Sequence, residues 1–423
     1  MRHLEYEKGA VMQVVSQEVV GERLGALGPD EPRIVVSGNF ATPWELVHLA
    51  VATIPVFRFF VLNAQAGWPQ REGIITETPF VGAGVRADDD LKYLPMRLSL
   101  VPRLFATSRP PDVVMIHTST PRNGKVSLGI ETNLLPAAIE EVRRRGGLVI
   151  AQLNSHMPYT FGDSEIVVDD IDLAIEFESV LPSPNERPPD ELARAIGESV
   201  ASLSSDGSTL QLGIGQLPDA ALDQMHHRRH LGVWSEMVSD GIMRLDRAGA
   251  IDVNRVMTST FLFGTPELYE WADENPRLVM RRTEVANNPS RIAEQSAMLS
   301  INTALQVDLY AQSNASFVRG RIYSGFGGQP DFVSGALHSR GGQAVLALRS
   351  WHEKSDSSNI VPLLSDPVCS FQHSVIVTEN GIAPIFGFSL QSQANSLIEH
   401  AAHPRAREQL SLAAQEMHLL GSD

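Results

Sequence analysis

Short runs of aliphatic and β-branched residues recur in the first half of the chain, and each is followed by turn residues and then by a helical pattern. The clearest runs are Arg33 to Val36, Asp112 to Ile116 and Gly147 to Ala151. We predict a helix from Leu135 to Arg145, because its last three arginines and the following Gly146 and Gly147 form a good stop signal. Strands that alternate with helices predict a mostly parallel sheet with helices on both faces.

The same alternation restarts after a proline-rich stretch. Four prolines lie between Pro182 and Pro189, which excludes regular secondary structure there and is typical of a linker. Beyond it we predict a helix from Glu191 to about Leu203, a strand from Thr209 to Leu212, a glycine loop and a helix whose first turn contains Pro218. Two later strands are predicted, from Ala344 to Leu348 and from Ser374 to Thr378.

The pattern therefore predicts an α/β protein made of two similar open α/β domains with mostly parallel sheets. A chain of 423 residues is too long for one ordinary hydrophobic core, which favours the same division. We predict an N-terminal domain over residues 1–183, a proline-rich linker over 184–190, and a C-terminal domain over 191–423 that carries the main candidate residues.

Composition narrows the class of function. Hydrophobic residues make up 43% and charged residues 20%, as in folded globular proteins. The formal net charge of −16 argues against binding to nucleic acid, which requires clustered cations against phosphates. A single cysteine, Cys369, excludes an intramolecular disulfide and disfavours a zinc-thiolate site, so a reducing compartment fits.

No segment suggests a membrane. The first residues, Met1 to Glu7, contain no apolar run of the signal-peptide type. The most apolar long stretch, Val47 to Ala64, is interrupted by His48, Pro55 and Arg58 and would span a bilayer poorly. We expect a cytoplasmic protein without a membrane partner.

The first candidate for chemistry is the loop that contains Gly213, Gly215 and Pro218, between a predicted strand and a predicted helix. Glycines at such a place let backbone N–H groups approach an anion or an oxyanion. A dinucleotide fingerprint would need a third glycine at Pro218, which disfavours that interpretation. A tight turn without a ligand is the alternative.

The second candidate is Glu236, an acidic residue within the apolar run Gly232 to Val238. A carboxylate is costly to bury without partners, and buried carboxylates with shifted ionisation gather at functional sites. Glu236 is therefore a candidate nucleophile or base. A purely structural carboxylate, tied to an arginine or to backbone N–H groups, is an equal alternative from the residues alone.

The third candidate is the segment Tyr323 to Phe332, which has Gly325, Gly327 and Gly328 flanked by aromatic residues. Its N–H groups could stabilise a developing oxyanion. A compact turn is the alternative.

Three other patterns carry less weight. His226 and His230 have the spacing of metal ligands on one helical face, but the intervening arginines would repel a cation, so we expect no metal there. Glu379 is followed by Asn380 and Gly381, as in a known reactive-glutamate motif, yet a strand-end turn is the stronger interpretation. Cys369 fits a small buried residue better than a nucleophile.

The three main segments, taken in this order, resemble the acetyl-CoA hydrolase/transferase family, which includes 4-hydroxybutyrate, butyrate and succinyl CoA-transferases. The resemblance covers most of the chain and includes five further segments. They are Ser37 to Pro43, Gly124 to Gly129, Asn154 to Asp163, Ile301 to Leu309 and Thr378 to His403.

The resemblance implies a fold of two open α/β domains with the active site in the cleft between them. It places the family's covalent nucleophile on Glu236, and it makes Gly213, Gly215, Gly327 and Gly328 the residues for oxyanion or CoA binding. Further candidate pocket residues are Asn39, Asn154, Trp234, Ser324, Phe326, Gln329 and Asp331. The family's habit suggests a homodimer or a larger homo-oligomer.

The implied reaction moves coenzyme A between an acyl-CoA and a small carboxylate through an acyl-glutamyl anhydride and a glutamyl-CoA thioester, with CoA as a substrate and no metal. An acyl-CoA hydrolase that uses the same glutamate and a non-catalytic acyl-CoA-binding protein are the alternatives. Trp234 stands where His or Tyr is usual, and Ala311 to Ser316 lacks the commoner Gly-Gln start, so the acyl group and the acceptor are not specified.

Overall fold

The computed structural model describes residues 12–27, 30–184, 188–368 and 370–420. Residues 1–7, residues 185–187 of the predicted linker, and Cys369 lie outside the described residues. The chain divides into two compact units. The first combines Met1–Pro184 with Thr258–Val285, and the second combines Asn185–Met257 with Ala286–Asp423.

The segment Thr258–Val285 packs with the first unit, although it lies inside the predicted second domain. Strand β17 (Leu278–Met280) pairs in parallel with β9 (Phe161–Gly162), and the Thr132 N–H donates to the Thr260 carbonyl oxygen at 2.9 Å. These are tertiary contacts that no local pattern predicts. The role of 184–190 as the domain linker stays a prediction.

The first unit is built on an eight-stranded sheet in which every neighbouring pair is parallel. Its central strands β6 and β8 are buried at every position, because both faces are covered. In sheet order the strands are β1 (Gln13–Val14), β11 (Leu173–Glu176), β8 (Leu148–Leu153), β6 (Val113–Thr118), β2 (Arg33–Val36), β3 (Phe57–Val61), β4 (Ile74–Thr78) and β5 (Lys92–Tyr93).

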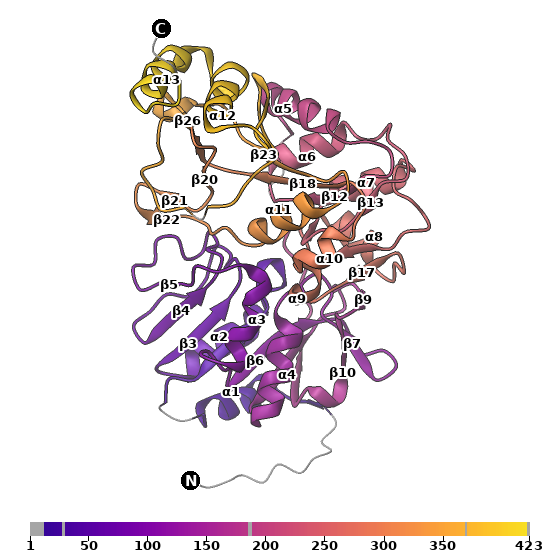
Figure 1. Ribbon diagram of the computed structural model, residues 1–423. Helices are drawn as coiled ribbons and strands as arrows, with labels where there is room; N and C mark the ends of the chain where they lie inside the picture. Colours follow the sequence, from indigo (N-terminus) through magenta and orange to yellow (C-terminus); the bar gives the residue numbers. More distant parts are fainter. Residues whose placement is uncertain (1–11, 28–29, 185–187, 369, 421–423) are drawn as a thin grey trace. The chain divides into compact units, whose positions relative to one another are not determined.

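Helices and short elements complete this unit (Figure 1). Helix α4 (Leu135–Arg145) buries Leu135, Ala138, Ile139 and Val142 on one face and ends at Gly146, whose φ is +75°. The other elements are α1 (Gln17–Gly25), η1 (Asn39–Ala41), α2 (Trp44–Thr53), η2 (Leu98–Leu100), α3 (Pro102–Ala106), β7 (Lys125–Ser127), β10 (Glu165–Val167), η3 (Val168–Asp170), β16 (Phe261–Leu262), α8 (Pro266–Ala272), β15 (Met257–Ser259) and α9 (Thr283–Ala286), the last two reaching the unit's boundary.

The second unit has a six-stranded sheet, parallel except for its last strand, which forms an antiparallel pair with its neighbour. In sheet order the strands are β13 (Gly232–Val233), β12 (Thr209–Leu212), β18 (Met298–Thr303), β23 (Gln343–Ala347), β27 (Val375–Thr378) and β28 (Gly381–Pro384).

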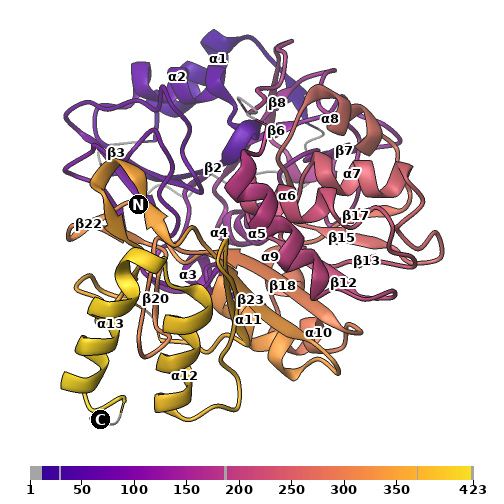
Figure 2. The same cartoon turned by 90° about the horizontal axis from the view of Figure 1, so that it is seen from above.

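The helices of this unit follow the same alternation. Figure 2 shows α5 (Glu191–Ser202) beside α6 (Gln216–Asp223), and the yellow helices α12 (Leu390–Ser396) and α13 (Pro404–Glu416) close to the C-terminus. The remaining elements are β14 (Met237–Val238), α7 (Asp240–Arg247), α10 (Pro289–Ala293), β19 (Gln306–Asp308), β20 (Ser313–Asn314), β21 (Phe317–Val318), β22 (Arg321–Ile322), α11 (Gln329–His338), β24 (Trp351–His352), η4 (Glu353–Ser355), β25 (Ser357–Ser358), β26 (Ile360–Val361) and η5 (Leu397–Ala401).

The predicted fold class is confirmed: each unit is an α/β body around a mostly parallel sheet. Each of the predicted strands corresponds to an observed one within two residues at either end, and the predicted helices become α4, α5 and α6. In a parallel sheet the loops at the carboxyl ends of the strands carry ligand sites. In the second unit these loops hold Glu236 and the Gly213–Gly215 turn.

Candidate functional site

Glu236 lies in the turn between β13 and β14. The strand before it is held against β12, since the Trp234 N–H donates to the Leu210 carbonyl oxygen at 3.1 Å. The Leu212 N–H in turn donates to the Ser235 hydroxyl at 3.2 Å. These bonds fix Glu236 at the carboxyl end of two neighbouring parallel strands.

Asn287 and Gly328 surround the Glu236 carboxylate. The Asn287 Nδ2 atom donates to Glu236 Oε2 at 2.6 Å. A Cβ atom on Gly328 would lie 1.9 Å from the same oxygen and 2.3 Å from Asn287 Nδ2, so only glycine fits at this position. The backbone of the glycine-rich loop therefore passes directly against the carboxylate.

The ionisation of Glu236 is strongly shifted. Burial raises the pKa of Glu236 from 4.5 to about 7, the hydrogen bond from Asn287 opposes that rise, and the charge of Asp331 adds to it. Asp331 is fully buried in the first turn of α11. A carboxylate with a raised pKa is more basic once ionised, and the hydrogen bond from Asn287 favours the ionised form that a nucleophile needs.

Trp234 also contributes to this arrangement. Its indole Nε1 donates to the Ala286 carbonyl oxygen at 2.8 Å, and Ala286 immediately precedes Asn287. The half-buried ring also packs against the hydrophobic cluster that contains Phe332 of α11. Trp234 thus links the strand that leads to Glu236 with the segment that carries its hydrogen-bond donor.

The predicted glycine-rich loop has the conformation that glycine permits. Gly327 has a φ of +51°. Gly328 is the N-cap residue of α11, and its carbonyl oxygen accepts hydrogen bonds from the Asp331 and Phe332 N–H groups. Ser324 is held by its N–H to the Ser316 carbonyl oxygen at 3.2 Å, and the Phe326 carbonyl oxygen accepts from the Gln329 N–H at 3.1 Å.

Two buried polar atoms of this region have no partner among the described residues, Gln329 Nε2 and Asn287 Oδ1. Both residues are more than nine-tenths buried. Unpaired buried donors and acceptors are costly unless a ligand or water completes them. Their presence near the start of α11 and beside Glu236 favours a substrate site.

The other glycine loop lies at the same edge of the sheet. Gly213 follows β12, and Gly215 precedes α6 with a φ of +134°, which a residue with a side chain rarely adopts. The Ser239 hydroxyl after β14 donates to Asp219 Oδ1 in the first turn of α6 at 2.8 Å. A role of this loop in oxyanion or CoA binding stays a prediction.

Asn39 and Asn154 belong to the first unit, at the carboxyl ends of β2 and β8. Asn39 has a φ of +47°, donates to the buried Glu131 carboxylate at 2.6 Å, and accepts from Asn63 at 2.7 Å. Asn154 donates to the Ser179 carbonyl oxygen and accepts from two backbone N–H groups. These bonds are those of loop-fixing residues, and a pocket role stays a prediction.

The weaker patterns take structural positions. His226 and His230 lie beyond the end of α6 and not on a helix, because the helix stops at Asp223. Glu379 accepts the N–H and hydroxyl of Ser350 at the end of β27, as expected for a strand-end turn. Within the described ranges, no group of three or more His, Cys, Asp or Glu side chains could hold a metal ion. No helix in those ranges is long and apolar enough to cross a bilayer.

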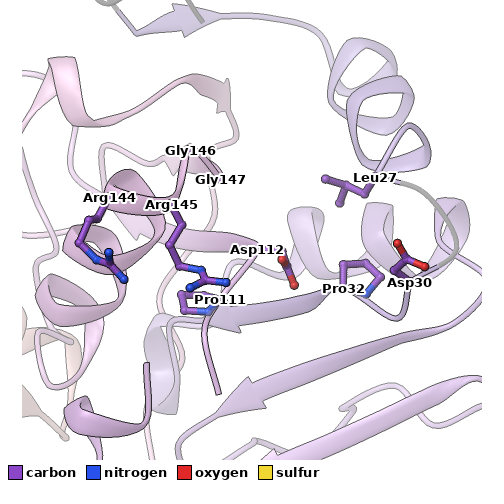
Figure 3. A pocket seen from close by; sticks show the side chains of 9 residues that line it. All are labelled: Leu27, Asp30, Pro32, Pro111, Asp112, Arg144, Arg145, Gly146 and Gly147. Carbon is purple, nitrogen blue, oxygen red and sulfur yellow. The ribbon is translucent and has the colours of Figure 1, made fainter. Parts of the chain in front are cut away.

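The first unit contains a cavity of about 550 Å³ at the amino ends of its strands. Figure 3 shows Arg144 and Arg145 on one side of it, Asp30 and Leu27 on the other, and Asp112 between them. The two arginines lie in the last turn of α4, at the negative end of its dipole, and Arg144 is already paired with Glu141 at 2.7 Å. This cavity is at the opposite edge from the loops that carry ligand sites in parallel sheets.

Asn287 is the candidate site residue that the sequence did not predict, and it is found only through its hydrogen bond to Glu236. It lies 51 positions after Glu236 and follows no strand or helix signal that could mark it. The adjacent Asn-Pro dipeptide, Asn288 and Pro289, indicates only a turn before a helix. The contact is a product of the tertiary fold.

Comparison with known proteins gives consistent matches. A family model described as the acetyl-CoA hydrolase/transferase C-terminal domain matches residues 264–414. The chain is 39% identical over 330 residues to a 4-hydroxybutyrate coenzyme A transferase of Clostridium kluyveri, covering 75% of this chain and 76% of that protein. It is 32% identical to a succinyl-CoA:acetate/propanoyl-CoA:succinate CoA transferase of Fasciola hepatica, covering 91% and 85%.

The same similarity is present in three dimensions. The crystal structure of RipA from Yersinia pestis superposes with a TM-score of 0.88 at 27% identity, covering 96% of this chain and 98% of that one. The likeness therefore extends over both units.

Proposed function

Because the chain belongs to the acetyl-CoA hydrolase/transferase family, we propose that it is a CoA-transferase whose covalent nucleophile is Glu236. The observation that carries this proposal is the surroundings of that carboxylate. It has a raised pKa, one strong donor in Asn287, and the backbone of Gly328 against its oxygen.

The reaction proceeds in two exchanges. The Glu236 carboxylate oxygen attacks the thioester carbonyl of an acyl-CoA, the C–S bond breaks, and CoA thiolate leaves behind an acyl-glutamyl anhydride. The thiolate then attacks the glutamyl carbonyl, the anhydride C–O bond breaks, and the first carboxylate departs. The enzyme now holds CoA as a thioester on Glu236.

An incoming carboxylate reverses these steps. Its oxygen attacks the glutamyl thioester to form a new anhydride, and the released thiolate attacks the acyl carbonyl of that anhydride. A new acyl-CoA forms and the Glu236 carboxylate is restored. One thioester replaces another, so no external energy source is required.

Each attack passes through an oxyanion, which needs preorganised donors. The N–H groups of Gly327 and Gly328 and of the Gly213–Gly215 turn are suited to this role, worth about 3–4 kcal/mol for a donor in other enzymes. Gln329, whose buried amide donor has no partner within the described part of the chain, is a candidate contact for substrate. Asn287 orients the nucleophile and favours its ionised form.

Hydrolysis of acyl-CoA is the competing function, since the family includes acetyl-CoA hydrolases and the same intermediates react with water. The two activities differ in the acceptor and not in the nucleophile. A transfer assay separates them: acetyl-CoA or butyryl-CoA is incubated with a labelled small carboxylate, and labelled acyl-CoA and free CoA are both measured.

Formation of labelled acyl-CoA that depends on the carboxylate, with little free CoA, is the result expected of a transferase. Free CoA released at the same rate without any carboxylate would make the chain a hydrolase. If the chain binds CoA but forms neither labelled acyl-CoA nor free CoA, it is a binding protein. Light scattering on the same purified protein measures its molar mass in solution and so tests the expected homodimer.

A further inference from the structure

The hairpin of β21 and β22 (Figure 1) carries Arg319 in its turn and Arg321 at the start of β22. Phe317 pairs with Ile322 and Val318 with Arg321, so the turn consists of Arg319 and Gly320. Their φ angles are +52° and +76°, as in the two-residue turns that favour Asn-Gly. Arginine at the first of these positions is strained, and strain that persists points to a function.

The hairpin is held firmly in spite of its exposure. The Gly320 N–H donates to Asp366 Oδ1 at 2.6 Å, which fixes the tip. The Tyr323 N–H donates to the Ser316 carbonyl oxygen at 2.7 Å, and Asn314 Oδ1 accepts the N–H groups of Ser316 and Phe317. The two guanidinium groups therefore project from an ordered support.

These guanidinium groups are uncommitted. Within the described residues, no hydrogen bond or ion pair engages the Arg319 or Arg321 side chain, and both residues are exposed. Of the other arginines of this unit, Arg244 pairs with Asp223 and Arg349 with Asp190, each at 2.8 Å, whereas Arg340 is also exposed and its side chain has no partner among the described residues. In a chain with a net charge of −16, Arg319 and Arg321 place two cations without side-chain partners, among the described residues, within three positions of the sequence.

The hairpin also leads directly into the loop beside the nucleophile. Seven positions separate Arg321 from Gly328, whose backbone lies against the Glu236 carboxylate. Such a segment spans at most about 25 Å. This reach is of the same order as an extended pantetheine arm, which separates the thiol of CoA from its diphosphate.

We propose that Arg319 and Arg321 form the binding site for the phosphate groups of the CoA nucleotide. The inference rests on the proposed function, because it assumes that CoA presents its thioester to Glu236. Guanidinium groups bind phosphate oxygens through paired hydrogen bonds, and exposed, rigidly mounted arginines can do so with little loss of conformational freedom.

The test is equilibrium binding measured by calorimetry on the full chain, with CoA and with pantetheine, which lacks the nucleotide and every phosphate. The variant combines Arg319→Asn with Arg321→Gln. Arg319→Asn gives the turn its preferred residue, so loss of folding is not expected. Arg340→Gln is the matched control, because Arg340 is another exposed arginine of the same unit whose side chain has no partner in the described residues.

We expect the double variant to raise the Kd for CoA about tenfold or more and to leave the Kd for pantetheine unchanged. The difference should shrink at high salt, because ions screen exposed charges. Persistence of the loss with 3′-dephospho-CoA assigns the contact to the diphosphate, and its disappearance assigns it to the 3′-phosphate.

A Kd for CoA within twofold of the unchanged chain would overturn the proposal, and so would an equal loss for CoA and pantetheine. Failure of the proposed function is separate, since these measurements need no turnover. If the chain binds CoA through this hairpin but transfers no CoA, the phosphate-site proposal stands and the transferase proposal fails.

Discussion

The Nδ2 atom of Asn287 lies 2.6 Å from Oε2 of Glu236, and it opposes a rise in the pKa of that carboxyl that burial imposes. A nucleophilic carboxylate must be ionised to react, yet a buried one resists ionisation. The Asn287 amide lowers the cost of ionising Glu236 in part. The first prediction follows from it.

Asn287→Ala should lower kcat/KM for acetyl-CoA about 10- to 100-fold near neutral pH. Removing the donor raises the pKa of Glu236 further above about 7, so the acid limb of the pH profile should move to higher pH. Rates measured from pH 5.5 to 9 test this. The control is Asn288→Ala, which removes the side chain of the neighbouring asparagine, the N-cap residue of α10, and leaves Asn287 in place. A fall in rate with an unmoved pH profile would argue against the role of Asn287.

The free energy of unfolding should also depend on pH through Glu236, because its pKa is higher in the folded protein than the ordinary value. The folded pKa of Glu236 is about 7 and the ordinary value is 4.5, so ionisation above pH 7 destabilises the fold and protonation below it relieves that cost. Glu236→Gln should therefore raise the Tm at pH 8, and the free energy of unfolding should increase by up to roughly 3 kcal/mol. The gain should fade toward pH 5. A variant that is equally stabilised at both pH values would contradict the pKa.

Trp234→Phe keeps the ring but removes the donor to the Ala286 carbonyl oxygen. We expect kcat to fall about tenfold, because Asn287 loses part of its support. The pH profile should move in the same direction as for Asn287→Ala. A double-mutant cycle between the two positions should show that their effects do not add. Additive effects would make Trp234 only a packing residue.

Gly328→Ala places a methyl group 1.9 Å from Glu236 Oε2. The carboxylate or the loop must shift, and we expect activity to fall about 100-fold or more while the circular dichroism spectrum stays unchanged. Gly25→Ala at the end of α1 is the control, since a Cβ there meets no atom within 4 Å and its φ is not positive. Near-normal activity of Gly328→Ala would contradict the close approach.

Asn39 offers a test of the polar cluster around Glu131 in the first unit. Its φ of +47° suits glycine better than alanine. Both Asn39→Gly and Asn39→Ala lose the bond to Glu131, but only the alanine adds backbone strain, of about 1 kcal/mol. Thermal denaturation should therefore rank the alanine variant as the less stable. The reverse order would contradict the left-handed conformation.

The sequence was informative where the determinants are local. The β-branched run at Arg33 to Val36 is a strand, because a buried strand needs an apolar residue at nearly every position. Glu236 stood out as an acidic residue within an apolar run, and its raised pKa agrees with the reason for choosing it. Gly327 and Gly328 were chosen because their N–H groups could stabilise an oxyanion; in the structure Gly327 has a φ of +51°, and Gly328 lies so close to the Glu236 carboxylate that a Cβ atom does not fit.

The sequence was silent where the determinants are distant. Nothing near Asn287 indicates a partner 51 positions earlier, and nothing near Glu131 indicates that Asn39 donates to it. The packing of Thr258–Val285 with the first unit depends on strand pairing across a long separation. Such contacts form only after the chain has folded, so local patterns do not report them.

The central claim is that Glu236 forms a covalent bond to the acyl group and then to CoA. The most direct measurement is the intact mass after incubation with acetyl-CoA or butyryl-CoA and borohydride, followed by peptide mapping. Reduction of a glutamyl thioester to an alcohol removes about 14 Da, and we predict this loss on the peptide that contains Glu236 and its absence in Glu236→Ala. An unchanged mass with every acyl-CoA, in a chain that still transfers CoA, would contradict the account.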